Sequence, residues 1–116
     1  MRKKVELFKV LSEQNRVRIL MMLLKRELCV CEIKSVLGLT TATVSNHLSY
    51  LRKEGFIEDE KDGKWTNYRI ARQITNPIIK DLIESLPGWY SNEKVIQNDF
   101  ILVQKVDRYE KSCSGK

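Results

Sequence analysis

The chain has 116 residues, which is enough for one small domain with a single hydrophobic core. Its formal net charge of +6 at pH 7 favours a polyanionic partner, either nucleic acid or an acidic membrane surface. The longest apolar run, ILMMLL, is far too short to span a membrane. The basic start, MRKK, precedes no secretory hydrophobic stretch, so we expect a cytoplasmic protein.

The first half of the chain shows helical periodicity. A first helix carries apolar residues at helical spacing: Val5, Phe8 and Leu11. A second helix covers the nearly continuous apolar run at residues 17–24, with Ser12 or Asn15 as its cap, and should occupy the centre of the core. A third, shorter helix contains Ile33 and ends at Gly38, a residue that readily adopts the left-handed C-cap conformation.

A fourth helix and a hairpin follow. The stretch TTATVSNHLSYLRKEG begins a helix at Thr40 and ends it at Gly55, with an apolar stripe of Val44, Leu48 and Leu51. The stretch FIEDEKDGKWTNYRI reads as two strands around Asp62-Gly63, which is a strong two-residue hairpin signal.

The last third of the chain is helical again. Asn76-Pro77 predicts an N-cap and a first helical proline, opening a helix that runs to about Leu86 and is broken by Pro87-Gly88. A final helix carries the apolar residues Val95, Ile96, Phe100, Val103 and Val106. We therefore expect one domain over residues 1–106 and a flexible polar tail over 107–116 that carries Cys113.

These elements predict a mainly α fold with a two-stranded β-wing, a winged helix-turn-helix. The fourth helix has small hydrogen-bonding groups and cations outside its apolar stripe: Thr41, Thr43, Ser45, Asn46, Ser49, Arg52 and Lys53. Such side chains fit the major groove and can contact base edges and phosphates. Lys61 and Lys64 flank the hairpin tip and are predicted to contact the DNA backbone.

The segments LFKVLSEQNRVRIL, ELCVCEI and TTATVSNHLSYLRKEGFIEDEKDGKWTNYRI resemble the ArsR/SmtB family of metal-responsive repressors, most closely its arsenic-responsive branch. The resemblance implies a homodimer, formed by the first and last helices, that binds operator DNA and leaves it when an ion binds. It also places Thr41, Ser45 and Asn46 at base-contacting positions. His47, the only histidine, either contacts DNA or orients the helix by a hydrogen bond.

Cys29 and Cys31 lie one residue apart at the predicted start of the third helix. Two residues on a helix are separated by about 200°, so at least one of these cysteines must lie outside the helix if both face one ion. With Cys29 as N-cap, Glu32 occupies the capping-box position and Cys31 the first turn. The helix N-terminus and Lys34 favour thiolates and Glu32 opposes them, so we expect reactive thiols. The alternative is a pair of buried spacers.

Thiolates without a nitrogen ligand set favour a thiophilic inducer: arsenite or antimonite, with Cd(II) or Pb(II) as the alternative. The family's zinc, nickel and cobalt sites need several histidines. Its arsenic branch has a third cysteine where this chain has Lys34. Cys113 is the remaining candidate for a third sulfur and is otherwise an idle tail thiol.

Three hypotheses follow. The first is a repressor released by a metalloid, the second a thiol redox switch that uses the same cysteines, and the third a winged helix that binds protein. No glycine-rich phosphate loop or placeable carboxylate pair indicates an enzyme, and no resident cofactor is expected.

Overall fold

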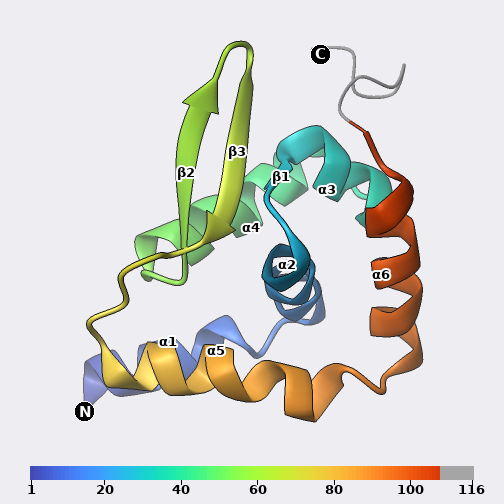
Figure 1. The fold of residues 1–116 in the computed structure, drawn as a ribbon. Coiled ribbons are helices and arrows are strands. Elements are labelled where there is room, and N and C mark those ends of the chain that lie inside the picture. The colour runs from blue at the N-terminus through green and yellow to red at the C-terminus, as the bar shows by residue number, and fades with distance from the viewer. Residues whose placement is uncertain (108–116) are drawn as a thin grey trace.

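The computed structural model describes residues 1–107, so Cys113 and the rest of the tail lie outside the described residues. Figure 1 shows a central helix, α2, surrounded by the other helices, with a hairpin that projects from the body. The elements in chain order are α1 (Arg2–Val10), α2 (Gln14–Lys25), β1 (Leu28–Cys29), α3 (Val30–Leu37), α4 (Thr41–Lys53), β2 (Ile57–Asp62), β3 (Trp65–Ile70), α5 (Pro77–Tyr90) and α6 (Lys94–Lys105).

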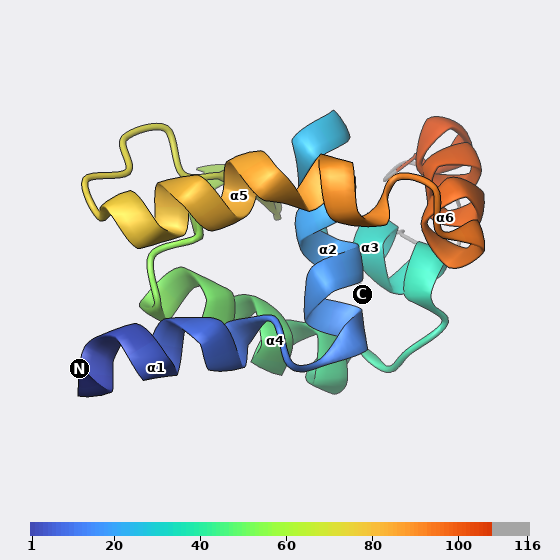
Figure 2. The ribbon, with the colours of Figure 1, turned by 90° about the horizontal axis from the view of Figure 1, so that it is seen from below.

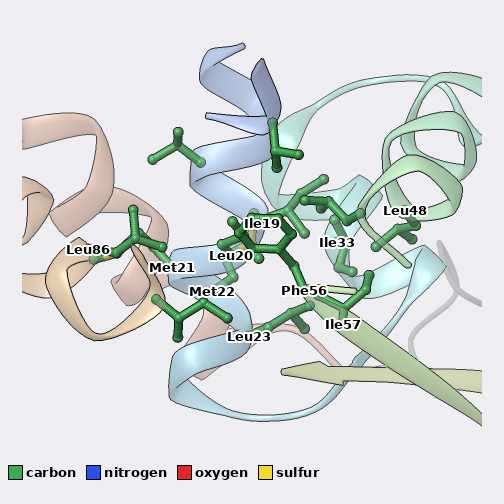
Figure 3. Packing of buried hydrophobic residues seen from close by; sticks show 14 of the residues in the cluster. Ile19, Leu20, Met21, Met22, Leu23, Ile33, Leu48, Phe56, Ile57 and Leu86 are labelled. Carbon is green, nitrogen blue, oxygen red and sulfur yellow. The ribbon is translucent and has the colours of Figure 1, made fainter. Parts of the chain in front are cut away.

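The hydrophobic core is built around α2, as its apolar run predicts. Five consecutive α2 residues, 19–23, are each less than 5% exposed, so this helix is buried on nearly all sides. Figure 3 shows these side chains surrounded by Ile33 of α3, Leu48 of α4, Phe56 and Leu86. Every other helix therefore packs directly or indirectly on α2. No helix within residues 1–107 is long and apolar enough to cross a membrane.

Local capping signals set several helix ends. Thr40 caps α4 through its Oγ1, which accepts a hydrogen bond from the Thr43 amide at 3.2 Å. Gly38 ends α3 in the left-handed region, with φ of 71°. The predicted caps of α2 are wrong, because Glu13 occupies the N-cap and its carboxylate accepts hydrogen bonds from the amides of Asn15 and Arg16. A charged carboxylate at a helix N-terminus also interacts favourably with the helix dipole.

The wing is a hairpin of β2 and β3, joined by the two residues Gly63 and Lys64, one position later than the Asp62-Gly63 signal predicts. Only Gly63 in this loop has positive φ, the pattern of a type II′ turn. The predicted two-stranded wing is confirmed, and the short strand β1 extends its sheet in the order β1-β3-β2. Cys29 of β1 pairs with Asn67 of β3, so the thiol segment is part of the wing's sheet.

The predicted break at Pro87-Gly88 is wrong, since α5 continues through both residues to Tyr90. A proline inside a helix costs about 3 kcal/mol. The buried side chains of Leu82, Ile83 and Leu86 each contribute about 1.5–3 kcal/mol in this helix, and Tyr90 packs on the core beyond the proline. Burial before Pro87 and the partial burial of Tyr90 after it therefore outweigh the local preference to stop.

A buried ion pair joins α6 to α2. The Arg18 guanidinium donates two hydrogen bonds to the Asp99 carboxylate, Nε to Oδ2 at 2.9 Å and Nη2 to Oδ1 at 2.8 Å. Asp99 is 1% exposed, and its hydrogen bonds with Arg18, together with its charge, raise the pKa of Arg18 above its usual high value. This bidentate pair fixes the position of α6 along α2.

Candidate nucleic-acid interface and thiol site

α4 separates an apolar inner face from a polar outer face. Val44, Leu48 and Leu51 are fully buried, which confirms the predicted stripe. The predicted contact residues on the remaining surface are mostly exposed: Thr41, Thr43, Asn46, Ser49, Arg52 and Lys53. Ser45 is half-buried on the same helix. The outer face of α4 is therefore a row of short polar groups that ends in two cations.

Two predicted contact residues of α4 have partners within the protein. The half-buried His47 points at the α2 N-cap, with its Nε2 3.9 Å from Oε1 of Glu13, a separation too long for a hydrogen bond. Arg52 lies 3.3 Å from Asp59 of β2, so the α4 cation is joined to the wing. Of the two contacts, only that of Arg52 is within hydrogen-bond distance.

The tip of the wing carries two exposed cations, Lys61 and Lys64. The ammonium of Lys64 lies 4.8 Å from the centre of the Trp65 ring. The same hairpin is rich in carboxylates, and Arg69 neutralises two of them, with its Nε 2.7 Å from Glu58 and its Nη1 2.9 Å from Glu60. The positive charge of the wing is thus concentrated at the tip.

Cys29 and Cys31 face each other at the start of α3. Cys29 is the N-cap with extended backbone, so only Cys31 lies on the helix, and their sulfurs are 3.1 Å apart. Glu32 occupies the capping-box position predicted for it, and its Oε1 accepts a hydrogen bond from the Cys29 amide at 2.9 Å. The sulfur separation is far longer than a disulfide bond of about 2.05 Å.

Burial gives the two cysteines different environments. Cys29 is 1% exposed, whereas Cys31 is half-buried. Desolvation raises the pKa of the Cys29 thiol, and its hydrogen bond with Cys31 offsets this only in part. The expectation that the helix start activates both thiols is therefore wrong for Cys29, because burial outweighs the helix N-terminus. Lys34 is half-buried one turn after Cys31.

The separation of the two cysteine sulfurs is compatible with a soft ion bound to both. Two sulfurs that share an ion through bonds of about 2.3 Å lie about 3.3–3.8 Å apart, close to the observed separation. Within residues 1–107, no cluster of three or more His, Cys, Asp or Glu residues could hold a metal ion.

Sequence reasoning missed two arginines that support these sites, Arg16 of α2 and Arg26 at the C-cap of that helix. Arg16 donates to the carbonyls of Lys9 and Val10 and stacks on Tyr50 of α4 at 4.6 Å. Arg26 contacts Glu32 and the end of α6. The contacts of Arg26 with α6 span about 80 residues of sequence, so no local pattern signals them.

A helix-turn-helix with a polar outer face on its second helix, followed by a hairpin wing, defines a winged-helix DNA-binding regulator. The family model described as "Bacterial regulatory protein, arsR family" matches residues 13–59. The arsenical resistance operon repressor of Escherichia coli K12 is 32% identical over 112 residues, covering 96% of this chain and 89% of that protein. The chain belongs to the arsR family and is a DNA-binding transcriptional repressor, not an enzyme.

Two further comparisons agree. The cadmium resistance regulatory protein CadC of Listeria innocua is 44% identical over 64 residues, which cover 54% of each chain. The structure of HlyU from Vibrio cholerae N16961 superposes with a TM-score of 0.66 at 33% identity and covers 78% of this chain and 94% of that one. The likeness to HlyU confirms the winged-helix fold predicted from the sequence.

Proposed function

We propose that this repressor is released from its operator when trivalent arsenic or antimony binds the thiols of Cys29 and Cys31. The observation that carries the proposal is the 3.1 Å separation of the two sulfurs at the capped start of α3. α3 is the first helix of the helix-turn-helix, and Cys29 is paired with β3 of the wing. A change at the thiols therefore acts directly on both elements that approach DNA.

The burial of Cys29 supports a neutral inducer. Arsenite is the uncharged trihydroxide at pH 7, and each thiol that binds it transfers its proton to a departing hydroxyl, which leaves as water. Two thiols thus form two S–As bonds and release two waters without any net charge entering the site. A divalent cation instead needs two thiolates and releases two protons. The raised pKa of Cys29 disfavours that reaction.

Cadmium is the second candidate, because CadC of L. innocua is a cadmium resistance regulator by name. The two can be separated by titrating the operator complex anaerobically with arsenite, antimonite, Cd(II) and Pb(II) at pH 6 and pH 8. Arsenite should release the protein at similar concentrations at both values, whereas release by a divalent ion should weaken at pH 6. Failure of arsenite and antimonite to release it would refute the proposal.

Cys113 is proposed as a third sulfur, in cis or from a second subunit. Trivalent arsenic forms three bonds, so two protein sulfurs leave one position for this thiol or for a hydroxide. X-ray absorption of the arsenite-loaded protein should count three sulfur neighbours in the wild type and two in Cys113→Ser. Two in both proteins would show that Cys113 is idle. Release of the fully reduced wild type by oxidant alone would instead favour the redox switch.

DNA readout is proposed for the outer face of α4, with Lys61 and Lys64 on phosphates. Replacing Asn46 or Ser45 by alanine should cost about 1–3 kcal/mol on the operator, because a base contact is lost. Lys64→Ala should weaken binding to every sequence and reduce the magnitude of the salt slope by about 1. Salt-dependent titrations on operator and random DNA measure both effects. Equal losses on random DNA for all three variants would contradict the assignment.

A homodimer formed by α1 and α6 is proposed from their exposed apolar residues. Phe8 of α1 is 56% exposed and Ile101 of α6 is 51% exposed, whereas Phe100 is half-buried beneath the ammonium of Lys25. Figure 2 shows α1 and α6 apart, on different sides of α2.

Phe8→Glu and Ile101→Glu should each lower dimer stability, because the change buries an unpaired charge at the interface. Operator affinity should fall as well, because the two half-sites are read together. Sedimentation velocity and footprinting test this prediction, with Gln14→Glu as a control of equal charge change at an exposed polar position. A wild type that is monomeric while it protects a palindromic site would contradict the dimer.

A further inference from the structure

Arg26 forms contacts that connect the thiol segment to the end of α6. It is the C-cap residue of α2 and stands three residues before Cys29. Its Nη2 donates to the carbonyl oxygens of Val103 and Val106, both at 3.0 Å. The last carbonyls of a helix have no partner within the helix, and its C-terminus attracts cations. Arg26 therefore stabilises the last turn of α6 from outside.

The same guanidinium also faces the thiol segment. Its Nη2 lies 3.6 Å from Oε2 of Glu32, whose other oxygen accepts the hydrogen bond from the Cys29 amide. Glu32 is only 6% exposed whereas the Arg26 side chain is 41% exposed, so water screens this interaction from the Arg26 side only. A continuous series of polar contacts thus runs from the Cys29 backbone through Glu32 and Arg26 to α6.

A pocket beside Arg26 and Glu32 provides space into which their side chains can move. A cavity of about 450 Å³ lies between Arg26, Glu32, Asn67 of β3 and the end of α6 at Lys105. The buried Cys29 lies next to Glu32 in the capping box, so an ion bound to its sulfur must displace groups around it. A shift of the Cys29 amide would act on the Glu32 carboxylate and, through it, on Arg26.

We propose that Arg26 is a positioning residue that couples inducer binding at the thiols to the position of α6, with Glu32 as the connecting group. This proposal rests on the proposed function for the inducer, and on α6 as part of the dimer interface for its effect on DNA. A displaced α6 changes the spacing of the two recognition helices of a dimer. Arg26 thereby contributes to the loss of operator affinity without contacting the ion or the DNA.

The first measurement is the ratio of operator Kd with and without arsenite. Arg26→Ala and Glu32→Gln should each bind arsenite at wild-type concentrations, as measured by the absorbance of the arsenic–sulfur bonds. Each should nevertheless reduce the ratio of operator Kd values by about 2- to 30-fold. The double variant should lose no more than either single variant, because both act in one path. Glu32→Gln retains an oxygen for the Cys29 amide, so the start of α3 stays capped.

Arg16→Ala is the matched control. Arg16 also lies on α2 and donates at 2.9 Å to two carbonyls at the end of a helix, in this case α1, and it stacks on α4 away from the thiols. Its loss can weaken DNA binding in both states, but the arsenite ratio should stay at the wild-type value. If the ratio of operator Kd values fell equally in Arg16→Ala and Arg26→Ala, the effect of Arg26 would be one on overall stability, and the proposal would be overturned.

The second measurement needs no inducer. In hydrogen exchange, Glu32→Gln should speed exchange in the last turn of α6 by roughly 2- to 10-fold, the effect of one weakened hydrogen bond, and should add nothing in an Arg26→Ala background. Unchanged exchange in Glu32→Gln overturns the coupling, whatever arsenite does. If arsenite fails to release the wild type, the proposed inducer falls, and this exchange experiment alone decides whether the path exists.

Discussion

Replacing Cys29 or Cys31 by serine is expected to leave operator binding nearly intact and to abolish release by arsenite. Serine preserves the size of the side chain, and at the N-cap position of Cys29 its hydroxyl caps α3 better than a thiol does. An inducer shifts an equilibrium only through its different affinities for two states. A repressor without its sulfur pair has no such difference and should remain on DNA at every arsenite concentration.

The measurement is operator release against arsenite concentration under strong reductant, with wild type and Cys113→Ser alongside. Cys113→Ser should need much more arsenite if the tail supplies a sulfur, and should follow the wild-type curve if it does not. Ser35→Ala, an exposed change on the same helix, controls for nonspecific effects. Release of both Cys29→Ser and Cys31→Ser at wild-type arsenite concentrations would show that the pair is a structural spacer.

Breaking the buried pair of Arg18 and Asp99 is expected to lower the free energy of unfolding by about 3–5 kcal/mol, a large part of the stability of a small domain. Arg18→Ala should be the more damaging change, because it removes the hydrogen-bond donor of the Asp99 carboxylate, which is 1% exposed. The Arg18 side chain is 17% exposed and can turn toward water when Asp99 is removed. Urea unfolding at one fixed protein concentration measures the free energy of unfolding of the variants at Arg18 and at Asp99.

Two controls separate the charge effect from lost packing. The double variant Arg18→Met with Asp99→Leu removes both charges and should recover most of the stability, since apolar replacements of a buried pair are often neutral. Glu6→Ala removes a surface ion pair with Lys9 at 3.2 Å and should cost less than about 0.5 kcal/mol. A loss for Arg18→Ala as small as that for Glu6→Ala would contradict the assigned role.

Most of the architecture could be predicted from the sequence because its signals are local. The apolar run in α2, the stripe of α4 and the caps at Thr40 and Asn76 each depend on residues within one or two turns. The placement of Cys29 outside α3, with Glu32 as its capping partner, follows from the same short-range rules and is confirmed. The polar outer face of α4 is likewise encoded by spacing alone.

The errors arise where distant contacts outweigh a local preference. Pro87 stops an isolated helix, yet the buried residues before it and the partly buried Tyr90 after it hold α5 together. Asp62-Gly63 predicts the hairpin, but the pairing of Asp62 with Trp65 moves the loop by one residue. The tail beyond residue 107, with Cys113, lies outside the described residues, so its predicted role stays a prediction.

The sequence by itself therefore determined a winged helix with a polar outer face on α4 and a thiol pair at a helix start. Only the tertiary structure decided the environment of that pair. It added β1 to the sheet of the wing, and it buried Cys29, which raises the pKa of the Cys29 thiol. It also brought Arg26 and Arg18 against α6, about 80 residues away in the chain. Desolvation and long-range polar contacts depend on which surfaces meet after folding, and no local spacing of residues encodes them.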